Sequence, residues 1–167
     1  ETPAPALGPV THPRGPIANL SEIAPGLYTG ADPSTPEAFD ELASLGVRTI
    51  VSVDGARPNV EGARAHGIRY IHIPFGYDYV PLEAQAAIAR VVEDAEWPVY
   101  FHCHHGQHRG PIGAAYALAL MEGVGGGVAS ARLTEAGYPR EYEALYVELE
   151  GFDPASLDRE AVRAALL

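Results

Sequence analysis

The fold of this chain can be read outward from residues 99–111, which spell Val-Tyr-Phe-His-Cys-His-His-Gly-Gln-His-Arg-Gly-Pro. The first residues are apolar and β-prone, so they predict a buried strand over residues 98–102. Pro111 opens an apolar run to Met121, which predicts a helix with proline in its first turn. A strand, a short loop and a helix in this order are typical of the sheet edge where α/β proteins bind ligands.

The rest of the chain alternates strands and helices in the same way. Apolar, β-prone runs predict strands at residues 26–28, 47–53 and 68–73. Apolar spacing and end signals predict helices at residues 34–45, 60–66, 82–96, 128–136 and 139–150. We therefore expect an α/β fold with a mostly parallel central sheet covered by helices on both faces.

Length and composition indicate a single globular domain. The chain has 167 residues, of which 47% are apolar and 20% charged, as expected for a soluble protein with one core. Residues 1–18 are rich in proline and predict a flexible tail, which leaves residues 19–167 as the domain. No stretch reaches the ~20 apolar residues of a membrane span. The compartment stays open between the cytoplasm and export with a leader removed.

The charge and the cysteine count narrow the function. A net charge of −11 argues against nucleic acid or anionic membranes as partners, so any anion site must be local. The single cysteine, Cys103, excludes an internal disulfide. It is either a core residue or a reactive thiol. The oligomeric state is not set by the sequence.

The loop that follows the strand has the residues of an anion site. Unpaired N–H groups and the dipole at a helix N-terminus favour an anion. Gly106 permits a backbone angle that other residues disfavour, and Arg109 offers a planar fork of donors for phosphate oxygens. The same surroundings favour the thiolate form of Cys103, which can attack a bound phosphoryl group. The sequence predicts Cys103 as nucleophile and Arg109 as phosphate clamp.

The pattern His-Cys-x-x-Gly-x-x-Arg resembles the signature of the protein tyrosine and dual-specificity phosphatase superfamily. Residues 24–30 and 45–51 are similar to the opening of its small members, and the loop is closest to the compact atypical ones from bacteria, fungi and plants. The resemblance covers about residues 19–152. It implies a phosphotyrosine-phosphatase-like fold and hydrolysis of phosphate monoesters through a phosphocysteine. No metal or organic cofactor is implied, and the partner is a phosphorylated protein or a small phosphorylated metabolite.

The resemblance also implies roles for further residues. The phosphate-binding residues are those of the loop: His104, His105, Gly106, Gln107, His108 and Gly110. The superfamily uses an aspartic acid on a movable loop as general acid, which implies Asp78, between the strand at 68–73 and the helix at 82–96. Asp54, after the preceding strand, is the reserve candidate.

Departures from the family pattern keep other functions open. The superfamily usually has Ser or Thr after the arginine, where this chain has Gly110, so a phosphate-binding module with little turnover is one alternative. The histidine and cysteine cluster leaves a metal-binding or redox thiol protein open, and a sulfur-transfer loop of the rhodanese kind is more distant. The loop has no lysine, which argues against highly charged substrates. Histidines carry positive charge below about pH 6.5, which predicts activity favouring mildly acidic pH.

Overall fold

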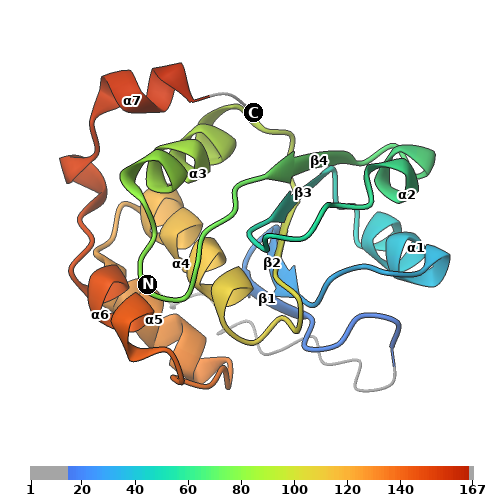
Figure 1. The fold of residues 1–167 in the computed structure, drawn as a ribbon, viewed down its shortest axis with the longest axis horizontal. Helices are drawn as coiled ribbons and strands as arrows, with labels where there is room; N and C mark the ends of the chain where they lie inside the picture. The colour runs from blue at the N-terminus through green and yellow to red at the C-terminus, as the bar shows by residue number, and fades with distance from the viewer. Residues whose placement is uncertain (1–14, 166–167) are drawn as a thin grey trace, which may run out of the picture.

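The computed structural model describes residues 15–165 and places a five-stranded sheet between two groups of helices (Figure 1). The strand order is β1-β2-β5-β3-β4. Their bounds are Ser21–Ala24 for β1, Leu27–Gly30 for β2, Thr49–Ser52 for β3, Arg69–His72 for β4 and Val99–His102 for β5. In the described part of the chain β1 pairs antiparallel with β2, and the other neighbours pair in parallel. The predicted fold class is therefore confirmed.

Helices cover both faces of the sheet. On one face lie α1 (Pro36–Ser44) and α2 (Val60–Ala65), and on the other lie α3 (Leu82–Asp94) and α4 (Arg109–Glu122). Around α4 pack α5 (Gly126–Glu135) and α6 (Glu143–Glu150), and α7 (Arg159–Ala164) follows a short 3-10 turn at Pro154–Ser156 and packs on α3. Thr35 caps α1 by accepting a hydrogen bond from the amide of Ala38, as the hydroxyl before Pro36 predicts.

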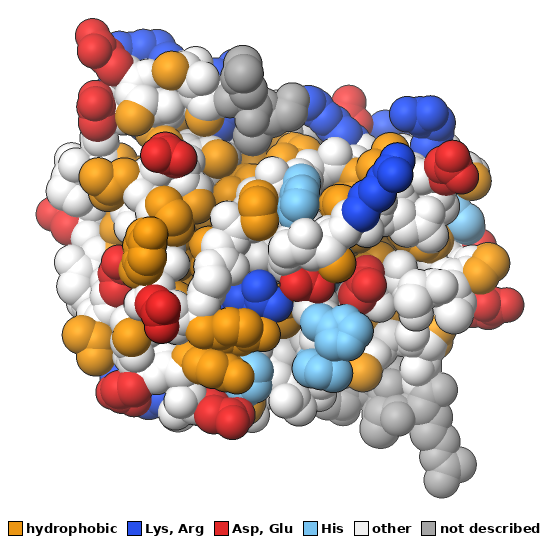
Figure 2. Space-filling view, in the orientation of Figure 1, with side chains coloured by type: hydrophobic (Ala, Val, Ile, Leu, Met, Phe, Trp, Pro, Cys, Tyr) orange, Lys and Arg blue, Asp and Glu red, His pale blue; other side chains and the backbone are white. Residues whose placement is uncertain are grey.

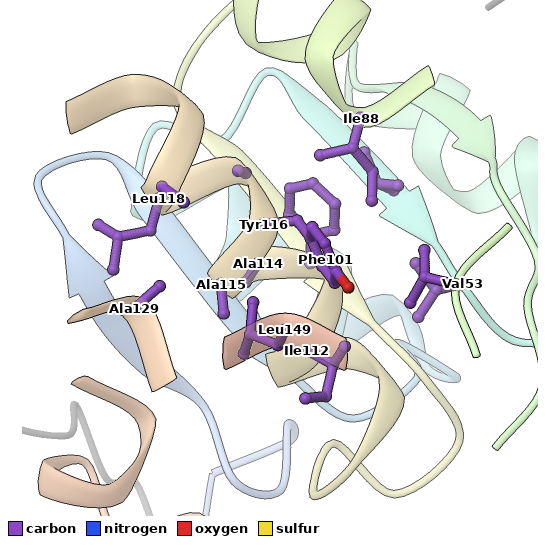
Figure 3. Packing of buried hydrophobic residues seen from close by; sticks show 14 of the residues in the cluster. Val53, Ile88, Phe101, Ile112, Ala114, Ala115, Tyr116, Leu118, Ala129 and Leu149 are labelled. Atoms are coloured by element: carbon purple, nitrogen blue, oxygen red, sulfur yellow. The ribbon is translucent and has the colours of Figure 1, made fainter. Parts of the chain in front are cut away.

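The core explains why β5 and α4 hold the centre of the molecule. Along β5 the side chains alternate: Phe101 packs toward α4, while Tyr100 packs on the opposite side with the helices α1 and α2. Every residue of α4 from Arg109 to Ala119 is buried, as expected of a helix that is apolar on all sides. Figure 3 shows Ile112 and Leu118 on α4 among side chains from the sheet and from three other helices. The start of α4 is thereby fixed against the sheet.

Several predicted element bounds need correction. The strand β1 was not predicted, and α4 begins at Arg109 rather than at Pro111. The helix expected over 139–150 begins at Glu143, and the one expected from 128 begins at Gly126. The run 68–73 was expected to be a buried strand, but Arg69 and His72 on β4 are exposed, because β4 is an edge strand with one neighbour.

The predicted tail at residues 1–18 falls mostly outside the described residues, which begin at Gly15. Within the described part, Ile17 is buried in the core cluster beside α1 and α2. Among residues 15–165, no helix has both the length and the apolar character needed to cross a membrane.

Candidate active site

Cys103 lies directly after β5, the middle strand of the sheet, and only 4% of its surface is exposed. Arg109 begins α4, so residues 103–108 form the loop that joins the strand to the helix. The first amides of a helix have no partner within it, and the helix dipole adds a partial positive charge there. The structure thus brings Cys103 and Arg109 together on one loop at a place suited to an anion.

The carbonyl groups at the start of this loop are turned toward the surrounding protein. Nδ1 of His102 donates to the carbonyl of Cys103 at 3.2 Å, and the amide of Asp32 donates to the carbonyl of His104 at 3.3 Å. The side-chain amide of Asn19 donates to the carbonyl of His105 at 2.8 Å. In a trans peptide the C=O and N–H groups point in opposite directions. The amides of residues 104–106 are therefore directed away from these partners, which is the arrangement an anion-binding loop needs.

The guanidinium of Arg109 is held from three sides. It donates to Oδ1 of Asp54 at 2.9 Å and to the carbonyl of Phe75 at 3.3 Å, and it lies 4.3 Å from the ring centroid of Tyr77. The ion pair is well buried, since the Arg109 and Asp54 side chains are 11% and 14% exposed. Within the described residues, Nε of Arg109 is buried without a hydrogen-bond partner. A fixed guanidinium with an unused donor suits a phosphate oxygen.

His102 is the last residue of β5, hydrogen-bonds to the start of the phosphate loop and is neutral. Burial lowers its pKa to about 4, so the ring is uncharged at neutral pH. Because a carbonyl can only accept, Nδ1 must carry the proton shared with Cys103, and Nε2 accepts from the Tyr70 hydroxyl at 2.5 Å. Tyr70 on β4 thus fixes the tautomer of His102, which in turn fixes the peptide of Cys103. Neither Tyr70 nor this chain of bonds was predicted from the sequence.

Gly106 occupies a position where a side chain would collide with the sheet. Its φ is +73°, and a Cβ built there would lie 2.3 Å from the amide nitrogen of Ala31 and 2.3 Å from the carbonyl carbon of Gly30. The backbone angle expected of Gly106 is confirmed, and the contact with the end of β2 adds a second reason for glycine.

We predict that Gly106→Ala lowers the free energy of unfolding by about 3 kcal/mol or more, because strain and overpacking act together. The matched control is Gly123→Ala, at a φ of +65° with nothing within 4 Å of the added Cβ. That change should cost only about 1 kcal/mol. Urea unfolding of the two variants and the parent measures the difference. Equal losses would show that the contact with β2 is not close.

Gly110 brings the first turn of α4 against the backbone of Cys103. A Cβ built at this position would lie 3.0 Å from the amide nitrogen of Cys103 and 3.2 Å from Cα of His102. A serine or threonine here would push the helix and the strand apart by a few tenths of an ångström. Glycine at position 110 thus lets α4 approach Cys103 more closely than serine or threonine would.

The two candidate acids have different surroundings. Asp54 accepts from Arg109 and from the amide of Gly55 at 2.8 Å, so its carboxylate positions the guanidinium. Asp78 is exposed on the loop between β4 and α3. Its neighbour Tyr77 lies over the Arg109 guanidinium, so this loop reaches the site. Asp54 is thus engaged by Arg109, whereas Asp78 lies exposed on a loop that reaches the site.

The remaining loop side chains face the outside of the loop. His104, His105 and Gln107 line a hollow of about 540 Å³ together with Asp32 and Asn19. Burial raises the pKa of Asp32, and the nearby Asp54 carboxylate adds to the increase, whereas His104 opposes it. Figure 2 looks onto this face, where histidine and acidic side chains gather around one basic side chain near the centre.

His108 is separate from that hollow. Its Nε2 lies 3.2 Å from Oε2 of Glu141, and its ring meets the edge of Tyr142 with centroids 4.7 Å apart. In the part of the chain that the structure describes, no three His, Cys, Asp or Glu side chains lie close enough together to hold a metal ion.

Sequence reasoning missed several residues that shape the site. Asp32 lies two residues beyond the end of β2, one of the strands that flank β5, a signal visible only once the strand order is known. Tyr142 and Glu148 come from the region of α6 and contact the loop of Asp78. Nothing in the local sequence marks these two as site residues.

Comparison with solved structures identifies the fold. TpbA from P. aeruginosa is 25% identical, with a TM-score of 0.72, over 97% of this chain and 99% of that chain. A Cys-to-Ser variant of TpbA in complex with phosphotyrosine is 23% identical, with a TM-score of 0.76, over 98% and 99%. The catalytic core of the PP-IP phosphatase SIW14 from S. cerevisiae is 18% identical, with a TM-score of 0.71, over 89% and 93%. No protein-family model and no curated protein sequence matches the chain.

SIW14 is a PP-IP phosphatase, and the TpbA variant was crystallised with phosphotyrosine. The chain shares their fold, which confirms the resemblance and the fold that the sequence predicts. They also bear out the predicted class of enzyme, a cysteine-dependent phosphatase.

Proposed function

We propose that this chain, which has the fold of the cysteine-dependent phosphatases, hydrolyses phosphate monoesters with Cys103 as nucleophile, Arg109 as phosphate clamp and Asp78 as general acid. One observation carries the assignment. Cys103 and Arg109 share a loop whose first carbonyls are held outward, and the guanidinium is fixed by Asp54 with Nε left for a ligand. The loop from His104 to Gly110 supplies the amides for the equatorial oxygens.

The reaction has two steps. The Cys103 thiolate attacks phosphorus, a P–S bond forms, and the bond from phosphorus to the leaving oxygen breaks. Asp78 gives its proton to that oxygen, so the alcohol or phenol leaves neutral. A water molecule then attacks the phosphocysteine and gives its proton to Asp78, which breaks the P–S bond and restores the thiolate. Arg109 and the loop amides stabilise the charge on the phosphoryl oxygens in both steps.

Aryl phosphates are the substrates that the site favours. The chain contains no lysine, its 11 basic residues are all arginine, and the net charge is −11. A ligand with several phosphate groups therefore finds neither lysines nor a net positive charge to bind it. Tyr77 and Tyr142 stack beside Arg109 with centroids 4.3 Å apart and offer an aromatic wall for a phenyl ring. The TpbA variant was crystallised with phosphotyrosine, which supports the same class. We therefore propose phosphotyrosine in a protein as the substrate.

We predict that Asp78→Asn slows phosphotyrosine hydrolysis by roughly 10²- to 10³-fold, because general acid catalysis is typically worth that much. The loss should be smaller with p-nitrophenyl phosphate, whose leaving group is a much stronger acid than tyrosine and needs less protonation. Initial rates between pH 5 and 8 measure both. The control is Asp94→Asn, at the far end of α3, which should leave both rates unchanged.

Other outcomes change the assignment. Equal losses on the two substrates would remove Asp78 from the role of acid. A parent that binds inorganic phosphate without turnover would be the phosphate-binding module that Gly110 keeps open. A parent that neither binds phosphate nor turns over an aryl phosphate would overturn the proposed function.

A further inference from the structure

The loop between β4 and α3, residues 73–81, is attached to α6 on both sides of Asp78 (Figure 1). Before Asp78, the Tyr77 ring stacks on Tyr142, with centroids 4.3 Å apart and an interplanar angle of 30°. After Asp78, the amide of Val80 donates to Oε1 of Glu148 at 2.6 Å. Tyr142 is the residue immediately before α6, at its N-cap, and Glu148 lies in the second half of the helix.

From this arrangement we propose that Tyr142 and Glu148 are positioning residues for the general acid: together, as the α6 clamp, they hold the loop of Asp78 over the phosphate site. The inference rests on the proposed function, since it takes Asp78 as the acid. It adds a role for two residues that the proposed chemistry does not use directly.

The α6 clamp is itself rigid. Leu145, Tyr146 and Leu149 bury one face of α6 in the main core. Arg140 pairs with Glu143 at 2.9 Å and with Glu150 at 2.7 Å, and so ties the segment before the helix to both of its ends. A platform fixed in this way can transmit its position to the loop that rests on it.

The clamp also contacts the phosphate loop. The same residues therefore fix the loop of Asp78 and the phosphate loop relative to each other. Tyr142 meets the edge of the His108 ring at 4.7 Å, and the adjacent Glu141 lies 3.2 Å from Nε2 of His108. His108 directly precedes Arg109, whose guanidinium lies 4.3 Å from the centroid of the Tyr77 ring. Tyr77 therefore contacts both Arg109 and Tyr142. The carboxyl group of Asp78 is then held at a constant distance from the leaving oxygen.

The test compares two substrates in Tyr142→Ala, Tyr142→Phe and Tyr79→Ala. Tyr79 is the matched control, because it lies on the same loop and is 60% exposed. If the clamp positions the acid, Tyr142→Ala lowers the rate on phosphotyrosine about tenfold more than the rate on p-nitrophenyl phosphate, since only the poorer leaving group needs the proton. Tyr142→Phe keeps the stacked ring and should restore the parent ratio. Tyr79→Ala should not change it.

A purely structural role gives a different result. If Tyr142→Ala lowers both rates by the same factor, the residue supports the fold and the proposal is overturned. The proposed function fails separately, through a parent without turnover or a Cys103→Ser variant that retains it.

Hydrogen exchange of residues 74–81 tests the clamp without any reaction. Faster exchange of this loop is expected in Tyr142→Ala and in Glu148→Ala, with no change in Tyr79→Ala. Loop exchange equal to that of the parent in both clamp variants would overturn the proposal even if the enzyme proved active.

Discussion

Cys103→Ser should abolish turnover of aryl phosphates, by about four orders of magnitude or more, while leaving the binding of inorganic phosphate in place. Serine is nearly the size of cysteine, but its hydroxyl does not ionise at neutral pH and is a far weaker nucleophile. The phosphate loop should keep its shape, because the bonds that hold it end on backbone carbonyls at Cys103, His104 and His105.

Initial rates on p-nitrophenyl phosphate and calorimetric titration with inorganic phosphate measure the two quantities. The control is the thermal unfolding temperature, which should be close to that of the parent. Turnover within tenfold of the parent would show that the thiol is not the nucleophile. Loss of phosphate binding together with activity would indicate that serine has disturbed the loop, and Cys103→Ala would then separate the two effects.

Arg109→Lys should lower kcat/KM by roughly 10³-fold, although the charge is conserved. Lysine has its three donors on one nitrogen instead of a planar fork, so it cannot span Asp54, the carbonyl of Phe75 and a phosphate oxygen in the geometry that the guanidinium provides. It also loses the flat contact with the Tyr77 ring. Asp54 would be left buried with a poorer partner, so part of the loss is the lost position of the cation.

The matched control is Arg48→Lys, because Arg48 forms an exposed ion pair with Glu96 at 3.1 Å. Arg48 precedes β3, at the end of that strand opposite to Asp54. Exposed ion pairs contribute about 0–1 kcal/mol, so that variant should resemble the parent in rate and stability. Steady-state rates at several substrate concentrations separate kcat from KM. An Arg109→Lys variant within a few fold of the parent would mean that any cation suffices at this position.

The local sequence was enough to predict those parts of the fold that depend on a single helix or strand. The apolar run of residues 99–101 and the helix after Pro111 were predicted because burial on all sides leaves a continuous apolar pattern. The strand β1 was missed because its four residues include Glu22 and are held by pairing with β2. Burial of β4 was overestimated because edge position depends on the order of strands.

The candidate site divides in the same way. The spacing from Cys103 to Arg109 and the need for glycine at 106 are local, and both could be predicted. Asp54 was considered as an acid, whereas the structure places it on the Arg109 guanidinium. That contact joins residues 55 positions apart, and local pattern has no information on such pairs. Tyr70, Tyr142 and Glu148 were missed for the same reason.

The separation of these partners along the chain has a consequence for folding. Asn19 reaches His105 across 86 positions, Val80 reaches Glu148 across 68, and Asp54 reaches Arg109 across 55. Contacts of such long range carry a larger loop-closure cost than local ones, so we expect them to form after the local helices and turns. These partners of the phosphate loop thus lie at residues 19–109, whereas the contact with Val80 needs α6, so a nascent chain ending before α6 has Cys103 and Arg109 but lacks the helix that holds the loop of Asp78.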